Sequence, residues 1–295
     1  MLRRLLAFTV LFFATTSARA DEHPEWTTPL TPFRITDNLY YVGSRDLASY
    51  LITTPQGDIL INSNLTSSPP QIRHSVEQLG FKWSDIKILL ISHAHFDHAA
   101  GSAQILRETH AKYMVMDGDV PVVESGGAKD FAYGPKPQYP PAHVDRILHD
   151  NDTVTLGNVT LTAHKTAGHT RGCTTWTLRV HVPGEPAQQL RNVVIVGSWN
   201  VNPGYRLVAS HGKPPSYPGI AQDYVHAFNV FAALPCDIFL GAHGMYFDML
   251  AKLARMPQHG DSVWIDPDGY RAAVAERKAA FETELHKQQQ AASAR

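Results

Sequence analysis

The alternation of apolar and polar positions predicts short strands near the start of the folded chain. Runs of alternating or β-branched residues, two of them separated by a proline- and glycine-containing turn at 55–58, occur at 38–43, 48–54 and 59–62. Such runs are typical of half-buried strands joined by tight turns. We therefore expect an antiparallel meander here.

A helix and a buried strand follow the meander. The segment 69–80 begins with proline, ends with glycine and carries Ile72, Val76 and Leu79 at helical spacing, which predicts an amphipathic helix. The continuous apolar run at 86–92 predicts a strand that is buried on both faces. Strand then helix in this order is typical of α/β folds.

The next segments continue this order. A helix is predicted near 99–110 and a strand at 112–116. The glycine- and proline-rich segment at 126–141 predicts a long loop, of the kind that forms lids over sites. We expect this loop to influence which substrates are preferred.

The second half of the chain again places strands before helices. Strands dominate 143–198, and after them we expect a helix at 220–234, a strand at 237–240 and a charged helix at 269–289. There is no sequence repeat. The two halves nevertheless indicate an α/β fold in which two sheets pack face to face with helices outside, a four-layer αββα sandwich with its site along the seam.

The composition fits a globular protein with a substantial core. The chain has 295 residues, of which 43% are hydrophobic and 18% charged, and this suits one large domain or two fused small ones. The net charge is −1 with no long run of one sign. Nucleic acid is therefore not an expected partner. A small, modestly polar substrate fits this charge balance better. We also expect the protein to be a monomer.

The first 20 residues have the features of a secretory signal. Arg3 and Arg4 precede an apolar stretch at 5–16, and Ala18-Arg-Ala20 offers a small-residue cleavage site before Asp21. A bilayer span needs about 20 apolar residues, so a membrane anchor is the poorer interpretation. We expect a signal peptide at 1–20, export to the periplasm without a stable membrane anchor, and a single domain at 21–295.

Cys173 and Cys236 are the two cysteines of the chain. In an exported protein they can form a disulfide. Each lies in an apolar, strand-like setting, where a free cysteine acts as a small buried hydrophobe. We favour two unpaired, buried thiols.

Four residues of the metal-ligand type occur within six positions, directly after the predicted strand at 86–92. They are His93, His95, Asp97 and His98. Side chains two positions apart point alike in an extended chain, so the first two histidines can share one metal. The adjacent Asp97 and His98 diverge and can serve a second centre beside the first. A polar loop with ordinary surface histidines is the alternative, which this clustering disfavours.

Two further histidines stand beside glycine at the ends of strand-like runs. His169 lies in Thr166-Ala-Gly-His-Thr-Arg-Gly172, and His243 in Phe239-Leu-Gly-Ala-His-Gly244. Loops after strands are where α/β proteins keep their chemistry. The other histidines are expected to be structural, and His164, on the strand entering the His169 loop, is better explained as a plain strand position than as a partner of the ligands.

These residues resemble the metallo-β-lactamase superfamily, which is marked by His-x-His-x-Asp-His and two histidines far downstream. Several segments are similar to class B β-lactamases of the third subclass: Asn38-Leu-Tyr-Tyr-Val-Gly43, Gly168-His-Thr-Arg-Gly-Cys-Thr-Thr-Trp176, Val201-Asn-Pro-Gly-Tyr205 and Ala233-Leu-Pro-Cys-Asp237. The resemblance covers most of the segment after residue 20. It implies zinc-dependent hydrolysis of the β-lactam ring of penicillins, cephalosporins or carbapenems, and thereby antibiotic resistance.

The resemblance implies two Zn²⁺ per chain. His93, His95 and His169 are expected to hold the first ion, and Asp97, His98 and His243 the second. Glyoxalase II and many lactonases add a bridging aspartate after a late strand, whereas here the run Val193-Val-Ile-Val-Gly197 leads into Ser198. The first two lactamase subclasses use a cysteine near that point, which is also absent. Both absences favour the third subclass.

The resemblance also implies roles in the reaction. Zinc lowers the pKa of a bound water to about 7, so that a metal-bound hydroxide can attack the lactam carbonyl. Asp97 is expected to orient this nucleophile and to pass a proton to the leaving nitrogen. Asn202 and Tyr205 are expected to contact substrate, although a loop-forming asparagine and a packing tyrosine explain them equally well.

Two positions depart from the family pattern. Relatives often pair the cysteine matching Cys236 with a second one, but the corresponding position here carries Tyr270. They also usually have aspartate where Asn62 stands. A neutral asparagine orients ligands less strongly, so weaker metal binding or lower activity is expected.

Two alternative functions remain open. Another di-zinc hydrolase of this fold would act on a lactone or a thioester. A zinc-binding protein with little activity would bind the metal and turn over neither amides nor esters.

Overall fold

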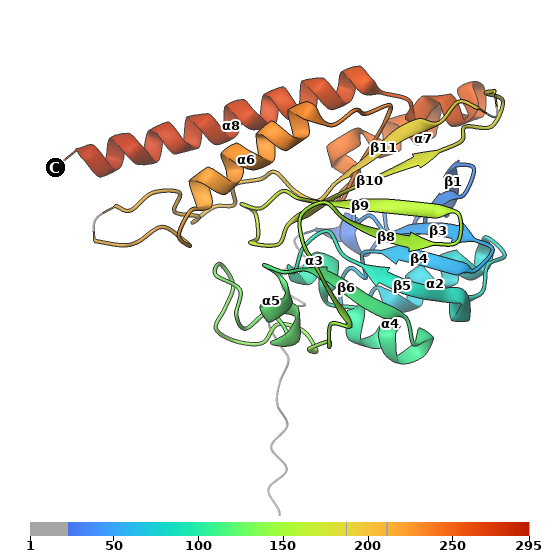
Figure 1. The fold of residues 1–295 in the computed structure, drawn as a ribbon, viewed down its shortest axis with the longest axis horizontal. Coiled ribbons are helices and arrows are strands. Elements are labelled where there is room, and N and C mark those ends of the chain that lie inside the picture. The colour runs from blue at the N-terminus through green and yellow to red at the C-terminus, as the bar shows by residue number, and fades with distance from the viewer. Residues whose placement is uncertain (1–22, 187, 211, 295) are drawn as a thin grey trace, which may run out of the picture.

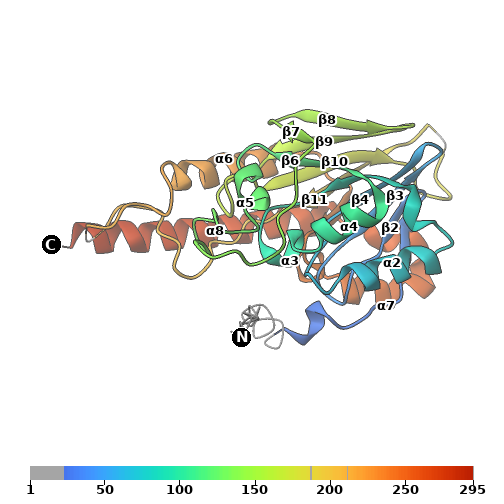
Figure 2. The same ribbon diagram turned by 90° about the horizontal axis from the view of Figure 1, so that it is seen from below.

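The computed structural model describes residues 23–186, 188–210 and 212–294, so the expected signal peptide at 1–20 lies outside the described residues. Two β-sheets pack face to face, and helices cover their outer surfaces (Figures 1 and 2). The expected four-layer α/β sandwich is confirmed. None of the described helices is long and apolar enough to cross a membrane.

The first sheet begins with the expected antiparallel meander and continues with parallel strands. Its strands lie in sequence order: β1 (Phe33–Thr36), β2 (Leu39–Tyr41), β3 (Tyr50–Thr54), β4 (Gly57–Ile61), β5 (Ile86–Leu90), β6 (Lys112–Met116) and β7 (Arg146–Leu148). Helices α2 (Pro69–Gln78) and α4 (Ser102–Thr109) connect the parallel strands β4, β5 and β6.

The second sheet has the order β12-β11-β10-β9-β8 and is antiparallel except for the parallel pair β11 and β12. Its strands are β8 (Asp152–Leu156), β9 (Val159–Lys165), β10 (Thr174–Val180), β11 (Arg191–Val196) and β12 (Ile238–Gly241). Helices α6 (Ile220–Ala233) and α8 (Pro267–Ser293) pack beside each other on this side of the molecule (Figure 1).

Side-chain alternation in β4 explains how the layers form. Ile59 and Ile61 belong to the core between the two sheets, together with Trp176 of the second sheet. Leu60 points the other way, into the cluster that contains Ile72 of α2. Because successive residues of a strand face opposite sides, one strand supplies apolar residues to both interfaces.

Two of the described α-helices were not predicted: α5 (Val120–Glu124) and α7 (Met249–His259). The expected helix at 99–110 begins earlier, at Phe96, and is divided between α3 (Phe96–Ala99) and α4. Consequently Asp97 and His98 lie in a first helical turn, and His93 and His95 lie on the loop that precedes it.

Both cysteines are unpaired, as expected, but Cys236 is only partly buried whereas Cys173 is fully buried. Tyr270, at the position where the resemblance leads us to expect a cysteine, is 3% exposed, and its hydroxyl donates a hydrogen bond to the Phe231 carbonyl at 2.9 Å. The space is therefore filled by packing.

Candidate metal centre

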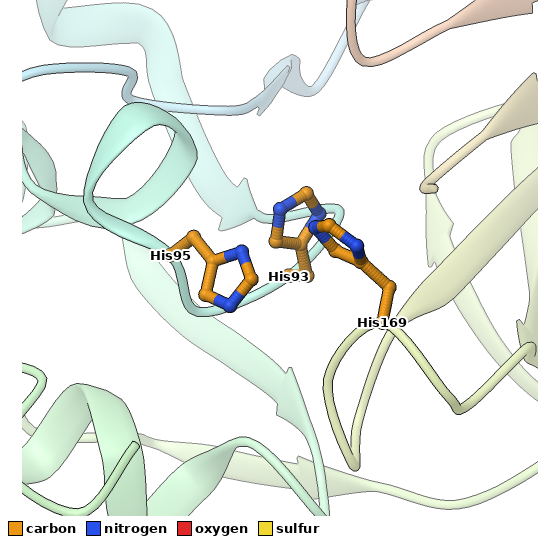
Figure 3. A group of neighbouring side chains, drawn as sticks. All are labelled: His93, His95 and His169. Atoms are coloured by element: carbon orange, nitrogen blue, oxygen red, sulfur yellow. The ribbon is translucent and has the colours of Figure 1, made fainter. Parts of the chain in front are cut away.

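Three histidines converge from two loops at one end of the sandwich. His93 and His95 lie on the loop after β5, and His169 lies on the loop between β9 and β10 (Figure 3). Their ring centroids are 4.8 Å (His93 to His95), 4.6 Å (His93 to His169) and 4.6 Å (His95 to His169) apart. One ligand atom from each lies within 4.8 Å of the others. A single metal ion can therefore contact all three.

A second group adjoins the first. Nε2 of His98 lies 3.4 Å from Oδ2 of Asp97 and 3.2 Å from Nε2 of His243, which follows β12. The same Asp97 oxygen is 3.6 Å from Nε2 of His243. A ligand atom of His93 also lies within 4.8 Å of ligand atoms of Asp97 and His98, so the two groups adjoin at His93. All six expected ligands are thus brought together, and four of them come from one six-residue run.

Hydrogen bonds to the outer nitrogens orient two of the rings. Nδ1 of His169 lies 2.8 Å from the Asn200 carbonyl, which can only accept, so this nitrogen carries the proton. Nδ1 of His243 lies 2.8 Å from Oδ2 of Asp46. In His169 the other ring nitrogen, Nε2, is then left with a lone pair. Histidine ligands of metals commonly have such partners.

Several buried ring nitrogens have no hydrogen-bond partner among residues 23–186, 188–210 and 212–294. They are both nitrogens of His93 and Nδ1 of His98. A buried polar atom left unpaired costs free energy comparable to a lost hydrogen bond. A metal ion would supply a partner for one nitrogen of His93, so this unpaired ring, which belongs to both ligand groups, fits a metal centre.

The charge states of the ligands also suit a metal. Burial, reinforced by His98 and His169, lowers the pKa of His93 well below its usual value. Burial lowers the pKa of His98 to about 4 and that of His169 to about 3. Burial alone would raise the pKa of Asp97, but His98 and His243 hold it well below its usual value. The group therefore offers neutral imidazoles and an ionised carboxylate.

Burial alone would lower the pKa of His243 as well, but its bonds to Asp46 and Asp97 raise it to about 9. A divalent cation beside Nε2 replaces the proton in this arrangement, because a ligand nitrogen must be deprotonated to bind metal. Nitrogen and carboxylate donors in two adjoining sets are the donors that zinc prefers.

Asp119 joins the two histidine loops and was not found from the sequence. Its Oδ2 accepts hydrogen bonds from the Ala94 amide and the Thr170 hydroxyl, both at 2.8 Å, and its Oδ1 accepts one from the Gly172 amide at 2.8 Å. The residue is 1% exposed. One buried carboxylate thereby fixes the loop of His93 and His95 against the loop of His169.

The loop at 126–141 lies against the same histidines. The Tyr139 hydroxyl donates to the Ala94 carbonyl at 2.6 Å. Oδ2 of Asp130 lies 3.5 Å from Nε2 of His95, and its Oδ1 accepts from the amides of Ala132 and Tyr133. The expected lid is therefore attached to the metal site at two points.

Asn202 and Tyr205 lie on the loop after β11. The Asn202 amide donates to the Tyr133 hydroxyl at 3.0 Å. The Tyr205 hydroxyl donates to the His169 carbonyl at 2.8 Å and lies 3.5 Å from Nε2 of His95. Both residues are therefore near the first histidine group, and their contact with substrate stays a prediction.

The remaining sequence predictions concern nearby positions. Ser198 follows β11, and its hydroxyl oxygen lies 3.2 Å from that of Tyr246, so no carboxylate occupies this position.

Asn62 stands where an aspartate was expected from the resemblance. Its Oδ1 accepts from the Ser92 amide at 2.7 Å, and its Nδ2 donates to the Ala48 carbonyl at 3.2 Å. An aspartate could not make the second bond. His164 bonds Thr177 at 2.9 Å, as a plain strand residue.

The family model described as the metallo-beta-lactamase superfamily matches residues 45–243. Among curated proteins, a probable metallo-hydrolase from Burkholderia pseudomallei (strain 1710b) is 32% identical over 111 residues. That match covers 38% of this chain and 36% of the relative's length. The chain thus matches only about a third of that protein.

Solved structures match over nearly their full length. The FEZ-1 metallo-beta-lactamase from Legionella gormanii is 50% identical with a TM-score of 0.84, and the match covers 89% of this chain and 98% of that one. LRA-12, described as a class B3 di-zinc metallo-beta-lactamase from an Alaskan soil metagenome, is 35% identical with a TM-score of 0.79. Its match covers 88% of this chain and 96% of that one.

Proposed function

This chain belongs to the metallo-beta-lactamase superfamily, and we propose that it is a zinc-dependent hydrolase of β-lactam antibiotics, a class B β-lactamase of the third subclass. The observation that carries the proposal is the convergence of two adjoining ligand groups, in a chain that has Ser198 and no acidic residue directly after β11. The similarity to FEZ-1 over most of both chains supports the same activity.

We further propose that the centre holds two zinc ions. His93, His95 and His169 would bind the first, and Asp97, His98 and His243 the second. When bound, zinc would polarise the lactam carbonyl and lower the pKa of a water molecule beside it.

Asp97 is the residue that we assign to proton transfer. The residue is 9% exposed, and His98 and His243 keep its carboxylate ionised. A carboxylate in this state can accept a hydrogen bond from the attacking water and so orient it towards the carbonyl carbon. When the ring C–N bond breaks, the proton that Asp97 has taken from the water passes to the leaving nitrogen. No covalent bond between enzyme and substrate is required.

Asn202 and Tyr205 are the residues that we assign to substrate binding. The Asn202 amide reaches Tyr133 of the loop at 126–141, and the Tyr205 hydroxyl reaches the backbone of His169. Turning either donor towards a substrate carboxylate or carbonyl requires exchanging one hydrogen bond for another. This exchange is compatible with binding, because its net cost is small.

The proposed activity also has a consequence for the cellular compartment of the protein. Export to the periplasm, where these antibiotics act, is consistent with the expected signal at 1–20. We propose that the exported chain works there as a monomer.

A substrate panel tests the reaction class. Zinc-loaded protein is given a penicillin, a cephalosporin, a carbapenem, an N-acyl homoserine lactone and a glutathione thioester at equal concentration. We expect turnover of at least one β-lactam with kcat/KM of about 10⁴ M⁻¹s⁻¹ or more, and far slower turnover of the lactone and thioester. Preferential cleavage of the lactone or thioester would contradict the proposal, and no turnover of any substrate would indicate a zinc-binding protein.

A further inference from the structure

We propose that Gln288, near the end of the last helix, is a positioning residue that holds the substrate loop against the metal site. Its Oε1 accepts a hydrogen bond from the Leu207 amide at 2.7 Å, and its Nε2 donates to the Tyr205 carbonyl at 2.8 Å. One side-chain amide therefore makes two bonds to the backbone of a loop 81 and 83 positions earlier in the chain. The inference rests on the proposed function.

The helix that carries Gln288 is itself firmly held. The Phe281 ring of α8 is 3% exposed and stacks on Tyr224 and Phe228 of α6, with ring centroids 5.2 and 5.6 Å apart. One turn before Gln288, Oε1 of Glu284 accepts the second hydrogen of the Gln288 amide at 2.9 Å. The amide is thus fixed in the orientation that matches an N–H and a carbonyl of the loop. In Figure 1, α8 runs along α6 beyond the sheets.

Side chains do not fill all of the space between this loop and α8. A cavity of about 690 Å³ is lined by Trp199, Asn202 and Tyr205 from the loop side and by Phe281, Glu284 and Lys287 from the helix. Tyr205 and Leu207 are themselves buried. The two bonds of Gln288 tie the backbone of these two residues directly to the helix beside this cavity.

Displacement of this loop would move groups that hold His169, one of the three histidines of the first ligand group. The Asn200 carbonyl accepts the hydrogen bond from His169, and the Tyr205 hydroxyl bonds back to the His169 carbonyl. The Tyr205 ring also packs on Phe131 of the loop at 126–141, with centroids 5.0 Å apart. The loop therefore carries an orienting group for one ligand and both residues that we assign to substrate binding.

The test compares Gln288→Ala with Gln289→Ala, whose side chain is exposed on the next position of the same helix. A third variant, Gln288→Glu, keeps an acceptor for the Leu207 amide but loses the donor to Tyr205 and meets the Glu284 carboxylate. Gln288→Ala loses both hydrogen bonds to the loop, and Gln288→Glu loses one and adds repulsion from Glu284. Each variant is predicted to show about a tenfold fall in kcat/KM for a β-lactam, mainly through KM. Gln289→Ala should match the wild type.

Hydrogen exchange gives a readout that does not depend on activity. In Gln288→Ala the Leu207 amide should exchange about tenfold faster, while amides of β10 keep their protection and the thermal midpoint changes little. An unchanged Leu207 amide, or an equal effect of Gln289→Ala, would overturn the inference. A wild-type protein that hydrolyses no β-lactam would contradict the proposed function instead, and the exchange of Leu207 would still decide the positioning role.

Discussion

The acidic residues around the metal centre act through the histidines and their loops. Asp46 holds His243 by its outer nitrogen and also accepts from the Met245 amide at 3.0 Å. Asp119 accepts three hydrogen bonds that join two loops. A carboxylate is suited to both tasks, since it only accepts and has room for several donors.

Replacing Asp46 by asparagine should weaken the second zinc site. The amide can accept from only one of His243 and Met245, and its NH₂ then faces the other donor. Loss of such a partner typically reduces metal affinity or activity by about 10- to 100-fold. Zinc titration against a chromogenic chelator measures this, with Asp37→Asn at an exposed turn as the control. Equal binding of two zinc ions by wild type and Asp46→Asn would contradict the role assigned to Asp46.

Asp58 predicts a pH dependence of stability far from the metal ligands. Asp58 lies near the start of β4 and is 5% exposed. This burial, together with the neighbouring Asp85, raises the pKa of Asp58 to about 6. The folded protein then binds this proton more tightly than the unfolded chain. The contribution of Asp58 to the free energy of unfolding therefore falls as pH rises from about 4 to about 6.

Asp58→Asn should abolish the fall in the free energy of unfolding that Asp58 causes between pH 4 and pH 6. At pH 7 the variant is expected to be more stable than the wild type by on the order of 1–3 kcal/mol, and at pH 4 the two should be nearly equal. Urea unfolding of both proteins in the presence of a chelator measures the difference. A stability difference that stays constant over this pH range would show that Asp58 does not titrate as described.

Residues of the metal site could be predicted where they lie close together in the sequence. His93, His95, Asp97 and His98 were recognisable because four ligand types fall in six positions. Asp46, Asp119 and Asp130 have no such signal. Their partners are brought to them only by the packing of distant loops, and isolated aspartates in loops are common on any surface.

Among the elements, those with a complete pattern were predicted well. Helix α2 begins at Pro69 as expected and ends at Gln78, two residues before the predicted end at Gly80. Strand β1, with four residues, and α5, with five, are too short to show a period. Helix α7 contains Pro257 in its last turn, which interrupts the helical pattern. Segments with a complete and uninterrupted pattern were therefore predictable, and these three were not.

The start of α8 shows a contact that the sequence pattern alone did not indicate. Oδ1 of Asp266 accepts the Gly269 amide at 2.9 Å and so caps the helix. Oδ2 of the same carboxylate lies 2.7 Å from Nζ of Lys252, whose side chain is 3% exposed. Asp266 thereby serves both the helix and a buried charge from α7.

Asp266→Ala should destabilise the protein by on the order of 3–5 kcal/mol, because it removes the cap and leaves Lys252 buried without a counter-charge. Chemical denaturation measures this. Asp268→Ala, at a side chain that is 91% exposed two positions later, should have little effect. The double variant Lys252→Met with Asp266→Ala should recover part of the loss. If the double variant is no more stable than Asp266→Ala, the buried charge is not the cause.

At the scale of the whole molecule, the metal centre exists because two sheets end at the same place. The loop after β5 belongs to the first sheet, whereas His169 and His243 follow strands of the second. The packing of two sheets between outer helices was expected from the order of strands and helices and from the family resemblance, and it is confirmed. The distances across the seam could not be predicted, since they depend on how the facing side chains pack.

Zinc dependence of β-lactam turnover is the sharpest test of whether this chain is a zinc β-lactamase. The rate of hydrolysis of a chromogenic cephalosporin is measured for the purified protein as isolated, after dialysis against a chelator, and after zinc is returned in increments. We predict that the rate falls by at least about a hundredfold on chelation and returns in proportion to the zinc bound. Turnover that persists without metal, or no turnover by protein that binds zinc at its histidines, would contradict the account.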